Sequence, residues 1–225
     1  SEMCIRDKSM QQSNGVNINP KTNPNYTVPI LSMDTGTYFD REFEMMDHNW
    51  TQTIEPRLFY VYIPYVNQTS IPVFDTTPYD FTYYQLFREN RYTGYDRIGD
   101  TNQVTAAVTS RIIDAERGFD RLRATFGNIA YFDNRQVTTI GTVPTTYSQS
   151  FSNLVADLYT GITEDWSFYT SGQYNASQSV FSRGQVGLTY NNRQNQILNL
   201  VYRYRQDQAT NGGCPSVNTI NYNYL

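Results

Sequence analysis

The chain has 225 residues, of which 21 are acidic and 17 basic, and charged residues make up only 17%, against about 25% in a typical soluble domain. No run of about 18 apolar residues occurs, which excludes a helical membrane protein, and the net charge of -4 argues against a basic nucleic-acid-binding protein. Aromatic residues make up 15% of the chain. Because aromatic side chains suit a pleated, half-buried surface, this composition favours β structure.

The chain begins with a segment that lacks periodicity. Residues 1–25 are polar, so we expect an irregular N-terminal segment, and residues 1–10 could be of non-native origin. The domain that follows spans residues 26–225 and is composed of predicted strands and turns. Because strand-like sequence continues to Leu225, we expect the chain to be an internal piece of a longer protein.

Three segments precede one long connection. Residues 26–39 are predicted to form a strand, residues 40–49 a charged connection, and residues 50–66 the first strong strand. Pro56 and Pro64 lack the backbone N–H that a sheet requires, which predicts a bend or a strand end near them. The connection over residues 66–102 is rich in aromatic residues and ends on a charged cluster.

The rest of the chain alternates strands with turns. The predicted strands are residues 103–113, 119–132, 150–162, 166–175, 181–190, 196–205 and 217–225. Together with the earlier segments this makes about nine strands of roughly 9–14 residues, close to the length that crosses a bilayer at a tilt.

The connections fall into two alternating sets. The short set comprises residues 114–118, 163–165 and 191–195. The other set is mostly longer and comprises residues 66–102, 133–149, 176–179 and 206–216. Short periplasmic turns opposite long extracellular loops are typical of outer-membrane barrels. We therefore expect an extracellular loop at residues 66–102.

The predicted strands have one apolar and one polar face. In residues 196–205, leucine and tyrosine alternate with asparagine and arginine. A soluble sandwich also alternates in this way, but aromatic residues gather at both ends of the strands, as in the aromatic girdles of a barrel. The predicted fold is all-β, an antiparallel up-and-down transmembrane β-barrel segment of about nine strands from a larger barrel. A soluble β-sandwich binding module and a porin-like barrel remain open alternatives.

Several long segments resemble one known family. They are QTIEPRLFYVYIPY at residues 52–65, the Phe-Asp pair at 74–75, QLFRENRYTGYDRIGDTNQVT at 85–105 and TSRI at 109–112. This pattern resembles the LptD family, the lipopolysaccharide-assembly proteins of the outer membrane. The resemblance is strongest over residues 40–112 and continues more loosely to about residue 206.

The resemblance implies a function and a location. It implies part of an outer-membrane translocon of Gram-negative bacteria that inserts lipopolysaccharide into the outer leaflet, assembles the outer membrane and carries out no catalysis. The implied partners are lipopolysaccharide, outer-membrane lipids, a plug lipoprotein of the LptE type, and a periplasmic lipopolysaccharide bridge reached through an N-terminal domain that we expect this piece to lack. No nucleic acid, cofactor or metal is implied.

The densest charge cluster lies in the predicted extracellular loop and consists of Arg88, Arg91, Asp96, Arg97 and Asp100. We expect it to act as a structural loop cap that folds over the barrel mouth and contacts the wall or a partner. A self-contained network of ion pairs is one alternative. Contact with lipid A phosphates is another, since guanidinium groups bind phosphate in a bidentate manner.

A second group of arginines is predicted to face the lumen: Arg111, Arg121, Arg123, Arg203 and Arg205. The alternative role for these residues is ordinary pairing with lumen carboxylates such as Asp157. No catalytic residues are predicted, because His48 lies in a predicted periplasmic connection away from any serine-rich site. A disulfide between Cys4 and Cys214 would require an oxidising compartment, and the sequence alone does not establish it.

Overall fold

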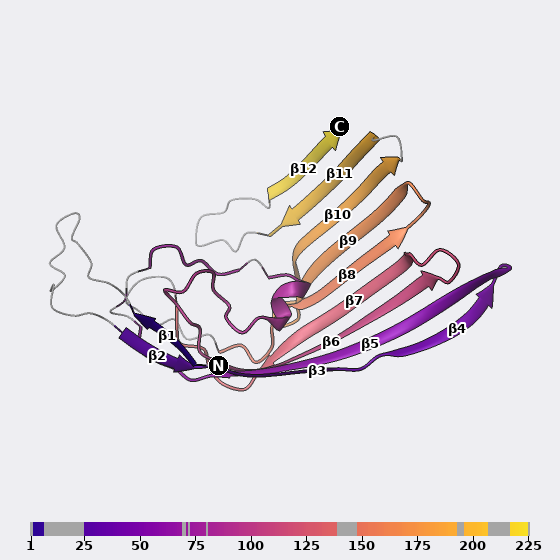
Figure 1. Ribbon diagram of the computed structural model, residues 1–225. Coiled ribbons are helices and arrows are strands. Elements are labelled where there is room, and N and C mark those ends of the chain that lie inside the picture. Colours follow the sequence, from indigo (N-terminus) through magenta and orange to yellow (C-terminus); the bar gives the residue numbers. More distant parts are fainter. Residues whose placement is uncertain are drawn as a thin grey trace.

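One curved antiparallel sheet makes up most of the molecule (Figure 1). A computed structural model describes residues 2–6, 25–68, 71, 73–79, 81–138, 148–192, 196–206 and 217–224. The elements in these parts are β1 Glu2–Arg6, β2 Asn25–Pro29, β3 Leu31–Gly36, β4 Phe39–Met45, β5 His48–Ile63, the 3-10 helix η1 Tyr83–Phe87, β6 Thr101–Asp114, β7 Asp120–Tyr131, β8 Leu154–Gly161, β9 Trp166–Asn175, β10 Val180–Asn192, β11 Gln196–Arg205 and β12 Val217–Tyr224.

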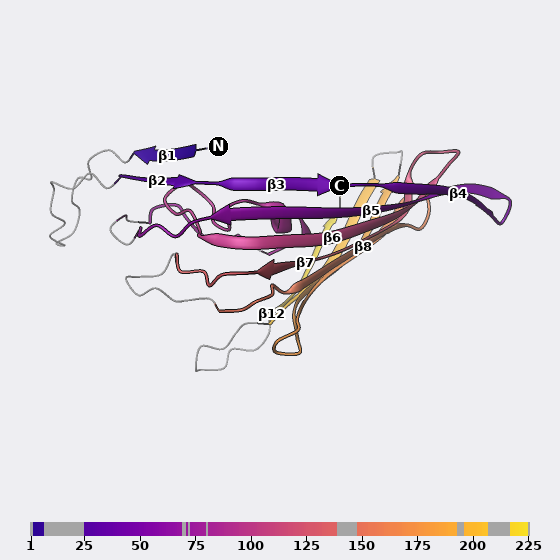
Figure 2. The same ribbon diagram turned by 90° about the horizontal axis from the view of Figure 1, so that it is seen from below.

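The strands of this sheet follow one another in chain order. The order is β12-β11-β10-β9-β8-β7-β6-β5-β3, and β4 also pairs with β5. Among the described strands β12 does not pair with β3, so the sheet is open, and Figure 2 shows it curling from the β3 edge towards β12. The prediction of an all-β antiparallel up-and-down sheet is confirmed, and its open, curved form is consistent with part of a barrel wall.

The short and long connections lie at opposite ends of the sheet (Figure 1). The short-turn end holds the β6–β7 and β8–β9 turns, together with a turn that the sequence analysis missed. We had expected residues 40–49 to be a charged connection, but they form β4, a two-residue turn and the start of β5. Met46 and Asp47 both have positive φ, 57° and 59°, as a tight hairpin turn of this hand requires. The charges of β4 concealed its alternation.

The N-terminal region also differs from the expectation of an irregular segment. Residues Glu2–Arg6 form β1, which pairs with β2. The predicted strand over residues 26–39 is divided into β2, β3 and the start of β4. Cys214 lies outside the described residues, so the structure does not test the disulfide.

Pro56 lies within β5 rather than at a strand end, and the edge of the sheet explains why it is tolerated. On one side β5 pairs with β6, where Pro56 is the register partner of Val108. On the other side β3 ends at Gly36 and β4 begins at Phe39. Thr37 donates its N–H to the Pro56 carbonyl in this break. A residue other than proline would direct its N–H towards this break between β3 and β4. The missing N–H of Pro56 therefore removes no hydrogen bond from the sheet.

The two faces of the sheet differ in polarity. Helix η1 covers the inner face. Thr105 and Thr109 lie on this face, as their hydrogen bonds to Leu86 and Tyr83 of η1 show. The alternate residues point to the outer face, where Val108 and its register partner Phe126 are exposed. Other large apolar residues exposed on this face are Ile54, Leu58, Val186, Leu200 and Tyr202. Within the described residues, no helix is long and apolar enough to cross a bilayer.

Candidate functional site

The connection between β5 and β6, residues 64–100, folds back over the inner face of the sheet (Figure 1). We call it the β5–β6 loop. Helix η1 and the residue Phe81 just before it form polar bonds with two strands, β6 and β9. Thr105 of β6 donates its Oγ1 hydrogen to the Leu86 carbonyl over 2.7 Å, and the hydroxyls of Tyr83 and Thr109 lie 3.0 Å apart. Gln173 of β9 donates its side-chain amide to the Phe81 carbonyl. These bonds fix the loop to the wall.

An apolar contact anchors the centre of η1. Leu86 is fully buried and forms a cluster with Ile129 of β7 and Val155 of β8. It reaches the backbone of β7 because residue 127 is glycine. A Cβ atom at Gly127 would lie 2.5 Å from Leu86 Cδ1 and 3.1 Å from the Ala107 Cβ. A glycine within a strand often marks such a close approach.

We expect Gly127→Val to displace η1 from the wall. The added side chain would occupy the space of Leu86 Cδ1, and a buried leucine that loses its site costs about 2–5 kcal/mol. Limited proteolysis of the full-length protein should therefore cleave the β5–β6 loop at least about 30-fold faster, since each 1.4 kcal/mol is a factor of ten.

Two variants serve as controls for this substitution. Ala106→Val adds volume on the outer face one strand away and should leave cleavage of the loop unchanged. Gly127→Val combined with Leu86→Ala should recover part of the protection, because the smaller side chain at position 86 makes room. Equal cleavage of the single and double variants would show that the clash does not govern docking.

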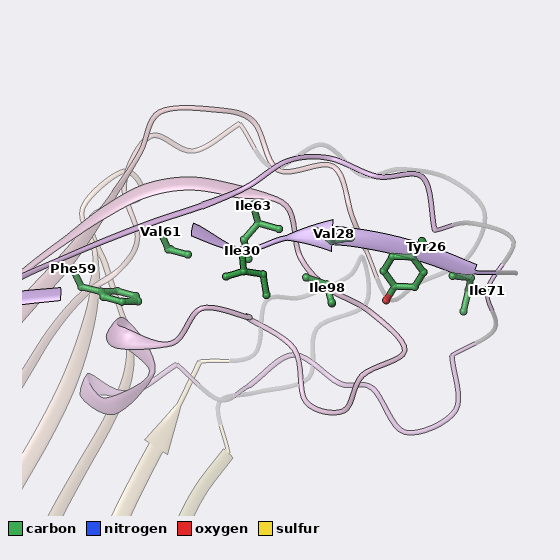
Figure 3. Close-up of a cluster of buried hydrophobic side chains, with 8 residues drawn as sticks. All are labelled: Tyr26, Val28, Ile30, Phe59, Val61, Ile63, Ile71 and Ile98. Atoms are coloured by element: carbon green, nitrogen blue, oxygen red, sulfur yellow. The ribbon is translucent and has the colours of Figure 1, made fainter. Parts of the chain in front are cut away.

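A second apolar cluster joins the loop to the outer ends of β2 and β5 (Figure 3). Its members are Tyr26, Val28, Ile30, Phe59, Val61, Ile63, Ile71 and Ile98. Phe59, Val61 and Ile63 occupy inner-face positions of β5, which are polar nearer the short turns, as at Thr53 and Glu55. The inner face is thus apolar where the loop covers it. Arg57 extends this contact, with its guanidinium carbon 3.9 Å from the centre of the Phe87 ring.

Arg91 and Asp100 form an ion pair within the β5–β6 loop, and the Asp100 carboxylate also bonds to a second loop. The Arg91 Nη2 to Asp100 Oδ1 distance is 3.1 Å, and the Asp100 side chain is only 6% exposed. The same carboxylate accepts the backbone N–H groups of Gln136 and Val137 over 2.7 and 2.8 Å. Tyr92 donates its hydroxyl to the Val137 carbonyl. The β5–β6 loop is therefore tied to the connection that follows β7.

Two amide side chains that the sequence analysis missed organise the loop internally. Asn90 Oδ1 accepts the N–H of Gly99, and its Nδ2 donates to the Arg97 carbonyl. Gln68 bonds both the N–H and the carbonyl of Ile98 over 3.0 and 2.8 Å, in the manner of a neighbouring strand. Neither residue carries charge, so a search for charged clusters does not find them.

Asp96 and Asp75 form an unequal pair of carboxyl groups. Burial opposes ionisation of Asp96, but hydrogen bonds from the N–H groups of Phe74 and Asp75 and from Thr76 Oγ1 outweigh it and lower the pKa of Asp96. The hydrogen bond to Asp96 and repulsion from its charge raise the pKa of Asp75. Asp96 thus remains the anion that shapes residues 74–76, and Asp75 is the first of the two to take up a proton as the pH falls.

The two remaining arginines of the predicted cap have different surroundings. Arg97 is 7% exposed and donates to the carbonyls of Ile71 and Asp96. Burial lowers the pKa of its guanidinium. Arg88 is exposed and contacts Tyr79, donating to its hydroxyl and lying 4.3 Å from the ring centre. The structure therefore places all five predicted cap residues in the β5–β6 loop, but only Arg91 and Asp100 pair with each other.

The predicted lumen-facing arginines lie in three different places. Arg111 pairs with Glu55 and Asp120, and Arg123 pairs with Asp120. Arg121 instead donates to the carbonyls of Gly161 and Ile162 at the short-turn end. Arg111 and Arg123 line a cavity of about 1110 Å³ on the inner face, beside Asp157 and the tyrosines 83, 159 and 169. Arg203 and Arg205 line a separate hollow.

The inner-face cavity offers polar and aromatic contacts. Its lining mixes hydroxyl, guanidinium and aromatic groups, which can hold a polar ligand or a partner surface by hydrogen bonds. In the parts of the chain that are described, no group of three or more histidine, cysteine or acidic residues is arranged to hold a metal ion.

Comparison with known proteins gives one consistent result. A family model described as "LptD: LPS transport system D" matches residues 5–222. A protein from Methylococcus capsulatus named "LPS-assembly protein LptD" is 40% identical over 216 residues, covering 88% of this chain and 21% of that protein. Proteins of the same name from Azoarcus sp. and Thiobacillus denitrificans are 39% and 40% identical, over 89% and 81% of this chain. The chain spans about a fifth to a quarter of the length of these relatives.

Proposed function

The chain belongs to the LptD family, and from this premise we propose that it forms part of the barrel wall of an outer-membrane protein that inserts lipopolysaccharide into the outer leaflet. The observation that carries the proposal is the match of the family model over residues 5–222. The family description names transport of lipopolysaccharide, so we assign the chain a role in transport and assembly and no catalysis.

The polarity of the sheet supports a wall that separates lipid from a polar interior. Large apolar side chains are exposed on the outer face, which suits contact with acyl chains, whereas the inner face carries threonines, serines and charged groups around the large cavity. A soluble sandwich would bury the apolar face against a second sheet. A general porin shares this polarity, and the family match favours the lipopolysaccharide protein over it.

The partners in this proposal are lipopolysaccharide, a plug lipoprotein of the LptE type and a periplasmic lipopolysaccharide bridge. The inner-face cavity supports a partner in the lumen, since its lining offers paired arginines and tyrosine hydroxyls to a protein surface. We further propose that the β5–β6 loop is a structural cap on the extracellular side. Its burial of Leu86 and Ile98 against the wall supports this role.

Depletion of the full-length protein in its own bacterium tests the transport role. Lipopolysaccharide labelled during the depletion should fail to reach the cell surface, while outer-membrane barrels made before the depletion remain. Complementation with the intact gene should restore surface labelling. Normal surface lipopolysaccharide in depleted cells would exclude the proposed function.

A further inference from the structure

A small pocket lies between the β5–β6 loop and the wall, with a volume of about 230 Å³. Its floor consists of buried residues of the loop and of strands β6 and β7, among them Tyr92, Gln103 and Ile129. Its rim includes the exposed residues Pro78 and Arg88. The pocket is therefore built on a fixed floor and can be reached from solvent.

Two buried polar atoms at this pocket have no hydrogen-bond partner among the described residues. They are the acceptor Gln85 Oε1 and the donor Arg91 Nε, and both residues line the pocket. Buried polar groups in proteins are almost always paired, so an unpaired one calls for a water molecule or a ligand. One acceptor and one donor remain here. Hydroxyl groups suit both, since a hydroxyl donates as well as accepts.

The Arg91 side chain is held in a fixed position. Its terminal nitrogens donate to the Asp100 carboxylate and to the carbonyls of Asp100 and Val137. The guanidinium also packs against Gly99, where an added Cβ would be 2.5 Å from Arg91 Nη1. These contacts leave the Nε–H as a donor, whereas Asp100 already balances the charge of Arg91. An uncharged ligand therefore fits this arrangement better than an anion.

Aromatic rings surround the pocket. Tyr79, Tyr92 and Tyr131 line it together with Phe81. An arginine guanidinium lies over the ring of each tyrosine, with its carbon 4.3, 4.9 and 3.6 Å from the ring centre. These cation–π contacts keep the three rings in place. The face of an aromatic ring is apolar and carries partial negative charge, so it attracts the C–H groups that a sugar ring presents on its own face.

The floor supplies a further polar group, and the size of the pocket limits its occupant. Gln103 accepts the hydroxyl hydrogen of Thr101 at Oε1 over 2.7 Å, which fixes the orientation of the Gln103 amide. The volume of about 230 Å³ is below the range of about 300–1,000 Å³ that is usual for sites of drug-sized ligands. The pocket therefore suits a single ring rather than a chain of rings.

We propose that this pocket binds one uncharged sugar ring. The sugar hydroxyls pair with Gln85 Oε1 and Arg91 Nε, and one face of the sugar lies against the aromatic wall. A free sugar and a sugar of the lipopolysaccharide carbohydrate share this chemistry, and the test distinguishes the two sources. The proposal does not depend on the transport role, which the depletion experiment tests separately.

The test uses the full-length protein, purified from its own bacterium in deuterated detergent. Saturation-transfer NMR detects magnetisation that passes from the aromatic rings of the protein to the C–H groups of a bound sugar. The probes are the methyl glycosides of glucose, galactose and mannose, and the oligosaccharide released from the lipopolysaccharide of the same bacterium. Gln85→Met keeps the length of the side chain and removes its polar atoms. Gln178→Met is the matched control, at an exposed position between β9 and β10.

We expect Gln85→Met to weaken sugar binding at least about fivefold, because a sugar hydroxyl is then buried without its partner. Phe81→Leu, which removes a ring from the wall, should also weaken binding, and Gln178→Met should not. Transfer to one ring of the oligosaccharide assigns the sugar to lipopolysaccharide, and transfer to a methyl glycoside alone assigns it to a free sugar. In the unmodified protein, sugar at ten times its dissociation constant should slow proteolysis of the β5–β6 loop about tenfold, since it binds only the docked loop.

Three results would overturn the site. The first is that no probe receives saturation from the unmodified protein, which would mean that the pocket holds water only. The second is equal binding of a sugar by the unmodified protein and by Gln85→Met, which would place the sugar elsewhere. The third is that saturating sugar leaves proteolysis of the loop in the unmodified protein unchanged. This last measurement needs no variant, so it decides the question even if the substitutions disturb folding.

Discussion

Deletion of residues 78–98 from the full-length protein should leave the outer membrane permeable to antibiotics that it normally excludes. The deletion removes η1 and Ile98, so the inner-face positions that they cover lose their apolar partners. Each fully buried apolar side chain contributes about 1.5–3 kcal/mol, and Leu86 and Ile98 are both buried. Water would then fill the space that the loop occupies. Growth on plates containing large antibiotics measures the effect, together with the amount of protein in the outer membrane.

A control separates docking of the loop from its length. Replacing residues 78–98 by a glycine–serine linker of the same length keeps the connection but removes its contacts, and should give the same permeability as the deletion. A linker variant that excludes antibiotics normally would show that the sequence of the loop is not needed to close the barrel. Normal exclusion and normal partner binding in the deletion variant would contradict the role as a cap.

The strands could be predicted from the sequence wherever one face is apolar and the other polar. The predicted bounds of β9, residues 166–175, and of β11, residues 196–205, agree with the structure. This alternation did not identify β4. Four of its seven side chains are charged, so the segment was predicted to be a connection. The alternation also did not explain Phe59 and Val61, which are apolar on the inner face because the β5–β6 loop folds back and covers them.

The site could be predicted only in part, because its contacts join residues far apart in the chain. The sequence shows that Arg91 and Asp100 lie in one charged cluster, but not that Asp100 also accepts backbone N–H groups from residues 136 and 137. It shows that Gly127 interrupts a strand, and this signal could have pointed to a close approach. The side chain that approaches Gly127 is Leu86. It lies in the β5–β6 loop, and the sequence has no periodic pattern there from which the position of the loop could be predicted.

Replacing Asp100 by alanine should have the largest effect of any single substitution in the β5–β6 loop. Removing one member of a buried ion pair costs about 3–5 kcal/mol, because the other charge loses its partner. Here the loss also leaves the N–H groups of Gln136 and Val137 without their acceptor. Hydrogen exchange at these two amides should therefore become at least about 100-fold faster, since each 1.4 kcal/mol is a factor of ten.

The two members of the pair should differ in their effects. Arg91→Ala removes the cation but leaves Asp100 bonded to both N–H groups, so exchange at Gln136 and Val137 should rise less than in Asp100→Ala. Asp133→Ala is the matched control, because this carboxylate of the same connection accepts only an exposed bond from Asn102. Such exposed contacts contribute little, and exchange should remain near that of the unmodified protein. Equal acceleration in the Asp100 and Asp133 variants would mean that the loops are joined by another contact. The predicted order, Asp100 above Arg91 above Asp133, follows from the number of bonds that each side chain makes between the two loops.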